Sequence, residues 1–143
     1  MIIGHASPFE KSSNHAPNYL LGSPIVVTRE STIDAFGVIA RKKARVVMAL
    51  YTDEPMALVA SIDPTELTVS EQTIRPLIHP TIAPGTYWLL AVFDRNASIG
   101  YDMTDKTPPV RYIRHQFHAP LPEQIDSFTR YEGQRFNFWL VTE

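Results

Sequence analysis

Residues 84–94, Pro-Gly-Thr-Tyr-Trp-Leu-Leu-Ala-Val-Phe-Asp, constrain the fold more than any other stretch of the chain. Pro84-Gly85 is a turn signal, eight residues without a charge or a helix breaker follow, and Asp94 ends the run. An apolar run of this length, bounded by turn residues and rich in aromatics, predicts a strand buried on both faces in the middle of a sheet. Alternation divides its side chains into two sets: Tyr87, Leu89, Ala91 and Phe93 on one face, and Trp88, Leu90 and Val92 on the other.

Shorter apolar segments predict further strands around this one, at 25–28, 32–40, 45–52, 56–62, 67–69, 73–79, 99–103, 110–118 and 134–142, and the sequence leaves 125–130 unassigned. The 45–52 segment is apolar on both faces and is expected beside the 85–93 strand or in the facing sheet. Pro76 and Pro80 place 67–69 and 73–79 at sheet edges, because proline has no N–H to donate. About eight to ten strands without a helical period predict an all-β fold, a two-sheet antiparallel β-sandwich of the jelly-roll type.

The length of 143 residues favours one domain, which we divide into an extended N-terminal arm at 1–24 and a β-sandwich domain at 25–143. The arm is rich in proline, yet it also carries a set of large apolar residues: Ile2, Ile3, Phe9, Tyr19, Leu20 and Leu21. Free tails are usually poor in such residues. The arm is therefore expected to pair with a neighbouring chain or along its own sheet edge, and the sequence leaves both alternatives open.

Composition argues against several function classes. The chain has no cysteine, which removes disulfides, thiol catalysis and zinc–thiolate sites. A net charge of -2 gives no general attraction for nucleic acid, and the basic cluster at 41–45 is typical of a solvated hairpin tip. No apolar run predicts a membrane span or a signal peptide. No motif of a hydrolase or phosphate-binding enzyme is present, so we expect no catalysis.

Aromatic residues in polar surroundings are the candidate ligand-binding residues. Tyr101, Tyr112 and Tyr131 lie in such surroundings and could form a platform for stacking sugars. Trp88 is expected in the core instead, because it belongs to the most apolar run of the chain.

Three aspartates near the loops that follow the 85–93 strand are the candidate metal ligands: Asp94, Asp102 and Asp105. Sandwich loops with several carboxylates can hold a structural calcium. Here the spacing is sparse, and aspartate also ends strands and forms turns, so we expect no cofactor and leave calcium as an alternative. His115 and His118 would point to opposite faces of a strand, which argues against a shared transition metal.

Four segments in order, at 18–22, 49–53, 55–60 and 83–88, carry core and turn residues that resemble a loose group of bacterial surface and extracellular β-sandwich accessory domains. That group has an "ALYTD…P..LVA…AGTYWL" pattern, and the resemblance covers roughly residues 18–142. This chain departs from the pattern with Ala-Pro-Gly at 83–85 and a shortened turn at 53–55. The resemblance implies the sandwich fold and an extracellular or cell-surface location, and it brings no catalytic motif.

Two functional hypotheses follow. The first is a non-catalytic structural or self-assembling module, such as a filament, surface-layer or decoration subunit, that forms homo-oligomers through the arm and the sheet edges. The second is a carbohydrate-binding accessory module of an extracellular protein, for which the tyrosines would contact the glycan.

Overall fold

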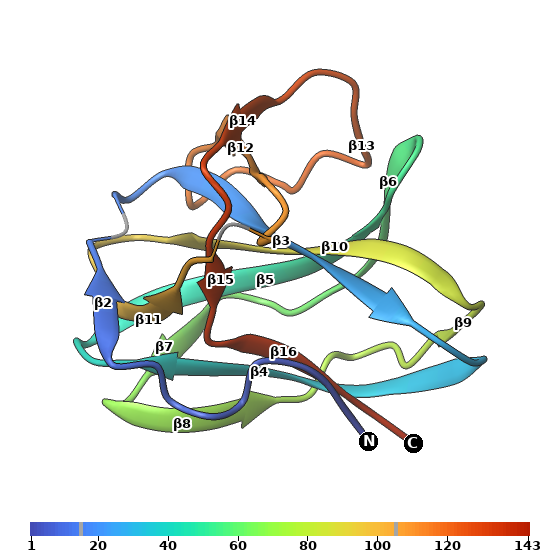
Figure 1. Cartoon of the computed structure of the whole chain (residues 1–143), viewed down its shortest axis with the longest axis horizontal. Helices are drawn as coiled ribbons and strands as arrows, with labels where there is room; N and C mark the ends of the chain where they lie inside the picture. The colour runs from blue at the N-terminus through green and yellow to red at the C-terminus, as the bar shows by residue number, and fades with distance from the viewer. Residues whose placement is uncertain (15, 105) are drawn as a thin grey trace.

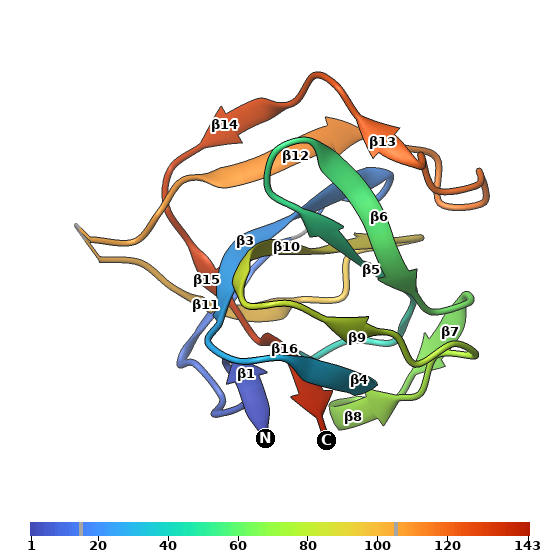
Figure 2. The ribbon, with the colours of Figure 1, turned by 90° about the vertical axis from the view of Figure 1, so that its right-hand side faces the viewer.

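The computed structural model describes residues 1–14, 16–104 and 106–143, whose regular elements are sixteen strands and no helix (Figure 1). The strands form two antiparallel sheets that pack face to face, which confirms the expected β-sandwich. Figure 2 shows the sheets as two layers, with β1, β16, β4 and β8 in one and β6, β5, β10, β3 and β12 in the other. The described residues contain no helix that could cross a membrane. Jelly-roll connectivity remains a prediction.

The sheet that contains the 85–93 segment is called sheet B. Its order is β13 (Gln124–Ile125), β6 (Met56–Ser61), β5 (Ala44–Thr52), β10 (Gly85–Phe93), β3 (Tyr19–Val27), β12 (Val110–Arg114) and β14 (Thr129–Tyr131), with β7 (Thr65–Leu67) also paired to β5. In the middle of it, Leu90 on β10 lies between Ala49 on β5 and Gly22 on β3. A side chain at Gly22 would place its Cβ 1.9 Å from the Leu89 carbonyl oxygen, so the close strand approach requires glycine. The 45–52 segment therefore lies beside the central strand.

The central strand β10 of sheet B is buried on both faces, as the apolar run predicts. The main core lies between the sheets and includes one set of β10 side chains: Tyr87, Leu89, Ala91 and Phe93. The second core lies on the outer face of sheet B and includes the other set: Trp88, Leu90 and Val92. Chain segment 115–128 covers this second core with Phe117, Leu121, Ile125 and Phe128. The buried Tyr51 hydroxyl ties that segment down by donating a hydrogen bond of 2.7 Å to the Pro122 carbonyl.

Trp88 is part of a stacked arrangement at the edge of the second core. Its Nε1 donates to Asp53 Oδ1 at 2.8 Å, and the Arg111 guanidinium lies 4.0 Å from its ring centroid. The same guanidinium lies 4.2 Å from the Phe128 ring centroid, and its Nη1 is 3.3 Å from Asp53 Oδ1. Arg111 is thus held between two aromatic rings and neutralised by a carboxylate, which makes its partial burial tolerable.

The other sheet is called sheet A. Its order is β1 (Ile2–Gly4), β16 (Phe138–Thr142), β4 (Ser31–Ala40), β11 (Ile99–Asp102) and β15 (Arg135–Phe136), with β2 (Lys11–Ser13) paired to β11 and both β8 (Ser70–Ile74) and β9 (Thr81–Ile82) paired to β4. The predicted 134–142 strand is interrupted at Asn137, and Phe136, Phe138 and Leu140 enter the main core as its alternation predicts.

Several predicted strand bounds are wrong, each for a local reason. The expected 73–79 strand ends at residue 74, because Pro76 cannot continue a hydrogen-bonded ladder. The expected 110–118 strand ends at residue 114, where the chain turns to cover the second core. The 125–130 segment, which the sequence leaves unassigned, is divided between β13 and β14, which lie in the same sheet beside different strands.

Strands from the described part of the first 24 residues pair within their own sandwich. β1 pairs with β16, β2 pairs with β11, and β3 crosses sheet B between β10 and β12. The fully buried Asn137 holds the connection between β1 and β2, because its Nδ2 donates to the His5 and Ser7 carbonyls at 3.0 and 2.8 Å and its Oδ1 accepts from Phe9 N at 3.1 Å. The boundary expected after residue 24 falls inside β3.

Candidate functional site

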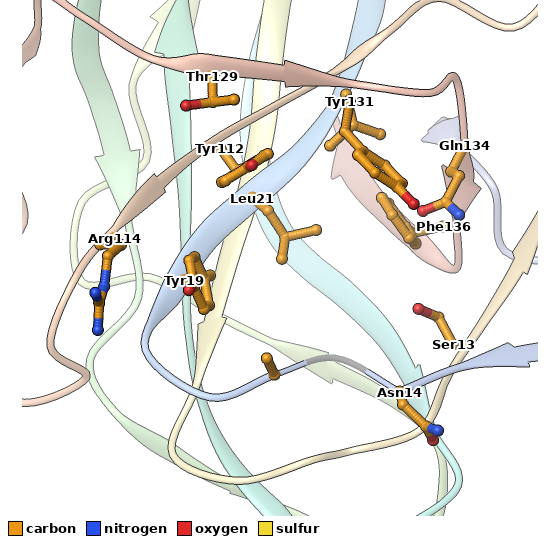
Figure 3. Close-up of a pocket in the computed structure, with 12 residues that line it drawn as sticks. Ser13, Asn14, Tyr19, Leu21, Tyr112, Arg114, Thr129, Tyr131, Gln134 and Phe136 are labelled. Carbon is orange, nitrogen blue, oxygen red and sulfur yellow. The ribbon is translucent and has the colours of Figure 1, made fainter.

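A cleft of about 580 Å³ opens between the two sheets at one end of the sandwich (Figure 3). We call it the tyrosine cleft. Sheet B supplies seven lining residues: Tyr19, Leu21, Val110, Tyr112, Arg114, Thr129 and Tyr131. The other wall comes from the end of β2, the β2–β3 connection, and β15 with the residue before it: Ser13, Asn14, Ala16, Gln134 and Phe136. The cleft is thus built from three separate segments of the sequence: 13–21, 110–114 and 129–136.

Strand alternation explains why these sheet B residues share one face. The side chains come from every second residue of β3, β12 and β14. Register aligns them across the sheet, because Tyr112 is paired with Leu21 on one side and Thr129 on the other. Arg114 is paired with Tyr19 in the same way. The three strands therefore present one continuous row of side chains to the cleft.

The floor of the tyrosine cleft is apolar. Val110 and Phe136 are each 2% exposed and belong to the main core, and Leu21 packs against that core. The main core therefore reaches the surface at this end of the sandwich without a further layer over it.

The walls of the tyrosine cleft are amphipathic. The rings of Tyr19 and Tyr112 meet edge to face, with centroids 5.9 Å apart and planes at 75°. Tyr131 is 54% exposed and stands at the outer edge strand, as Figure 3 shows. Tyrosine combines a flat apolar ring with a hydroxyl, so it can contact apolar and polar parts of one ligand.

Polar side chains complete the rim. Ser13, Asn14, Thr129 and Gln134 offer hydroxyl and amide groups to the cleft. Part of this rim is fixed, because Asn96 Nδ2 donates to Asn14 Oδ1 at 3.1 Å. The Ser23 hydroxyl likewise donates to the Gln134 carbonyl at 2.6 Å, which holds the backbone before β15.

The structure brings together two of the three tyrosines that were singled out as a platform. Tyr112 and Tyr131 line the tyrosine cleft, while Tyr101 lines a separate hollow of about 280 Å³ beside Phe9 and Asp102. Sequence reasoning missed Tyr19, because it assigned that residue to the arm. The alternation of Tyr19 with Leu21 was the signal that could have placed it on a strand face.

The three candidate metal ligands do not meet in the described part of the chain. Asp94 Oδ1 accepts from Arg45 N at 2.8 Å and lies 3.7 Å from Arg95 Nε. Asp102 is hydrogen-bonded to Arg135 and to the Met103 amide. That hydrogen bond from Arg135 holds the pKa of Asp102 below its usual range. Asp105 lies outside the described residues, and no cluster of three or more metal-ligating side chains occurs among the rest.

Comparisons with known proteins give no relative. The chain matches no protein-family profile, and neither curated proteins nor solved structures show a significant match. The resemblance to bacterial surface sandwich domains therefore stays an expectation from the sequence.

Proposed function

We propose that this chain is a non-catalytic carbohydrate-binding module of an extracellular or cell-surface protein, and that the glycan binds in the tyrosine cleft. One observation carries the proposal: Tyr19, Tyr112 and Tyr131 converge with polar side chains over an apolar floor. Ligand sites of about 300–1,000 Å³ with aromatic walls and a few polar groups are typical of small-molecule binding, and the cleft falls in this range at about 580 Å³.

The chemistry of sugars matches this arrangement. A pyranose ring has an apolar face of C–H groups that packs against an aromatic ring, and a rim of hydroxyls that need hydrogen-bond partners. The three tyrosines supply the rings, and Ser13 and Gln134 supply partners at the rim. The described lining residues include no carboxylate, whereas most glycosidases use a pair of them, so binding is favoured over hydrolysis.

A glycan array tests the proposal with the wild type and two cleft variants, Tyr131→Ala and Tyr112→Ala. Tyr131 is 54% exposed, so its removal is expected to leave the fold intact while removing one wall. Loss of one stacking ring should weaken binding about tenfold, which corresponds to about 1.4 kcal/mol.

Tyr101→Ala is the matched control, because it removes the same side chain outside the tyrosine cleft. Thermal melting of each variant separates loss of binding from loss of folding. If no glycan binds the wild type, or if Tyr131→Ala and Tyr112→Ala bind as tightly as Tyr101→Ala, the proposal is wrong.

Assembly is the second candidate function, and one observation favours it. Leu77 and Ile78 are 88% and 75% exposed in the β8–β9 connection, and they share a mostly apolar hollow with Leu58 and Val59 on β6. Burying this apolar surface against another molecule contributes a favourable free energy of roughly 25 cal/mol per Å².

Light scattering over a range of concentrations tests this candidate with the wild type and the double variant Leu77→Ser, Ile78→Ser. Assembly predicts a mass that rises with concentration in the wild type and stays monomeric in the double variant. A wild type that remains monomeric throughout contradicts it.

A further inference from the structure

Arg114 gives the tyrosine cleft a positive charge that binding of a neutral sugar leaves unused. It ends β12, and its guanidinium carbon lies 5.9 Å from the centroid of the Tyr19 ring. Figure 3 shows Arg114 at one end of the cleft, beyond Tyr19 and Tyr112. Among the described lining residues, it is the one charged side chain.

Arg114 also differs from the arginines that are held in ion pairs. Four arginines have an aspartate within 4.0 Å, in the pairs Arg75–Asp34, Arg95–Asp94, Arg111–Asp53 and Arg135–Asp102. Within the described part of the chain, Arg114 has no carboxylate at that distance. Its five N–H donors therefore remain for a ligand, while the ring of Tyr19 limits where the guanidinium can lie.

Positive charge also flanks the opposite rim of the tyrosine cleft. Asn14 is hydrogen-bonded to Asn96, in the loop that follows β10. The Lys42 amide donates to the Ala97 carbonyl at 3.0 Å, so the basic β4–β5 turn lies against the same loop. Figure 1 places this turn and the β2–β3 connection at one end of the sandwich. A chain that leaves the cleft across Asn14 would meet this basic turn.

We infer that the ligand of the tyrosine cleft is an acidic glycan, whose sugar carboxylate pairs with Arg114 while its rings stack on Tyr112 and Tyr131. The inference rests on the proposed function, because it concerns the same site. A guanidinium accepts a carboxylate through two parallel N–H···O bonds, which fixes the orientation of the sugar as well as its charge. The acidic chain continues across Asn14 toward the basic β4–β5 turn.

The test compares glycans that differ only in charge. The probes are trigalacturonate with its trimethyl ester, and sialyllactose with its methyl ester, each measured by calorimetry on the wild type. At least one acid is expected to bind about tenfold or more tightly than its neutral partner, the usual strength of a charge-assisted hydrogen bond. Raising the salt concentration from about 0.05 to 0.5 M should weaken the binding of that acid and leave the binding of its neutral partner unchanged.

Arg114→Gln should abolish the preference for the acid, so that the acid binds no more tightly than its neutral partner. Arg130→Gln is the matched control: it removes the same charge from the neighbouring strand β14, at a position that lines a different hollow with Arg111. Melting temperatures confirm that both variants fold.

The possible failures are distinguishable. Binding of neutral glycans as tight as that of their acids overturns this inference and leaves the proposed function standing. An equal loss of acid and neutral binding in Arg114→Gln also overturns it, because the residue would then only support the cleft. Absence of binding to any probe and to the array overturns both proposals.

Discussion

Trp88→Ala should destabilise the protein more than most single changes, because Trp88 is a large buried member of the second core on the central strand of sheet B. The side chain is 5% exposed, and deleting a large buried aromatic costs about 3–5 kcal/mol through lost transfer energy and the cavity left behind. For a chain of this size, that loss lowers the melting temperature by about 6–20 °C. The Arg111 guanidinium, 4.0 Å from the ring centroid, would also lose one of its two stacking partners.

Trp88→Phe separates packing from hydrogen bonding at the same position. Phenylalanine keeps a ring beneath Arg111 but cannot donate to Asp53, as Trp88 Nε1 does at 2.8 Å. Losing this bond to a carboxylate should cost about 1.5–3 kcal/mol, so the expected order of stability is wild type, Trp88→Phe, Trp88→Ala.

Urea unfolding monitored by circular dichroism measures the three free energies of unfolding. Val26→Ala is the control, because Val26 is 63% exposed on β3 and its truncation should change stability by less than about 0.5 kcal/mol. A Trp88→Ala variant that unfolds at the same urea concentration as Val26→Ala would refute the burial of this strand on both faces.

Three further changes test other parts of the structure. Gly37→Ala should lower the melting temperature, because its Cβ would lie 1.9 Å from the buried Trp139 ring, and calorimetry of the variant checks this. Asn137→Ala should cost about 1–3 kcal/mol and speed protease cleavage within residues 5–9, as followed by mass spectrometry, because three backbone groups lose their partner. Asp102 has a lowered pKa in the folded state because of its hydrogen bond from Arg135, so its stabilisation is present above its unfolded pKa and is lost as pH falls below about 4. In urea unfolding at several pH values, Asp102→Asn should therefore lose less stability on acidification than the wild type does.

The central part of the fold could be predicted from local pattern. The uninterrupted apolar run at 85–93 places Trp88 and Leu89 on opposite faces, and the structure puts these two residues in different cores. The sequence predicted only the end of β3, at 25–28, although this strand is also central in the sheet. Gly22 and Pro24 argued against a longer strand, because both residue types are unusual in a strand interior. The structure accommodates Pro24 because β12 pairs with β3 only over residues 19–22. On the side that faces β12, Pro24 therefore interrupts no backbone hydrogen bonds between strands.

The candidate site was less predictable, because it depends on pairings between distant segments. Polar surroundings indicated Tyr101, Tyr112 and Tyr131 equally, but only the last two line the tyrosine cleft. What separates them is the register of β3, β12 and β14, which joins residues near 20 to residues near 130. Alternation gives the face of each strand but not its neighbour in the sheet, so the contribution of Tyr19 required the structure.

Tyrosine side-chain resonances, followed by NMR during titration with the strongest ligand from the array, test the central claim most directly. Binding in the tyrosine cleft predicts that the ring signals of Tyr19, Tyr112 and Tyr131 shift in proportion to occupancy. Tyr51 in the second core and Tyr87 in the main core, which do not line the cleft, should keep their positions. Shifts confined to other residues, with the three cleft tyrosines unchanged at saturation, would contradict the account.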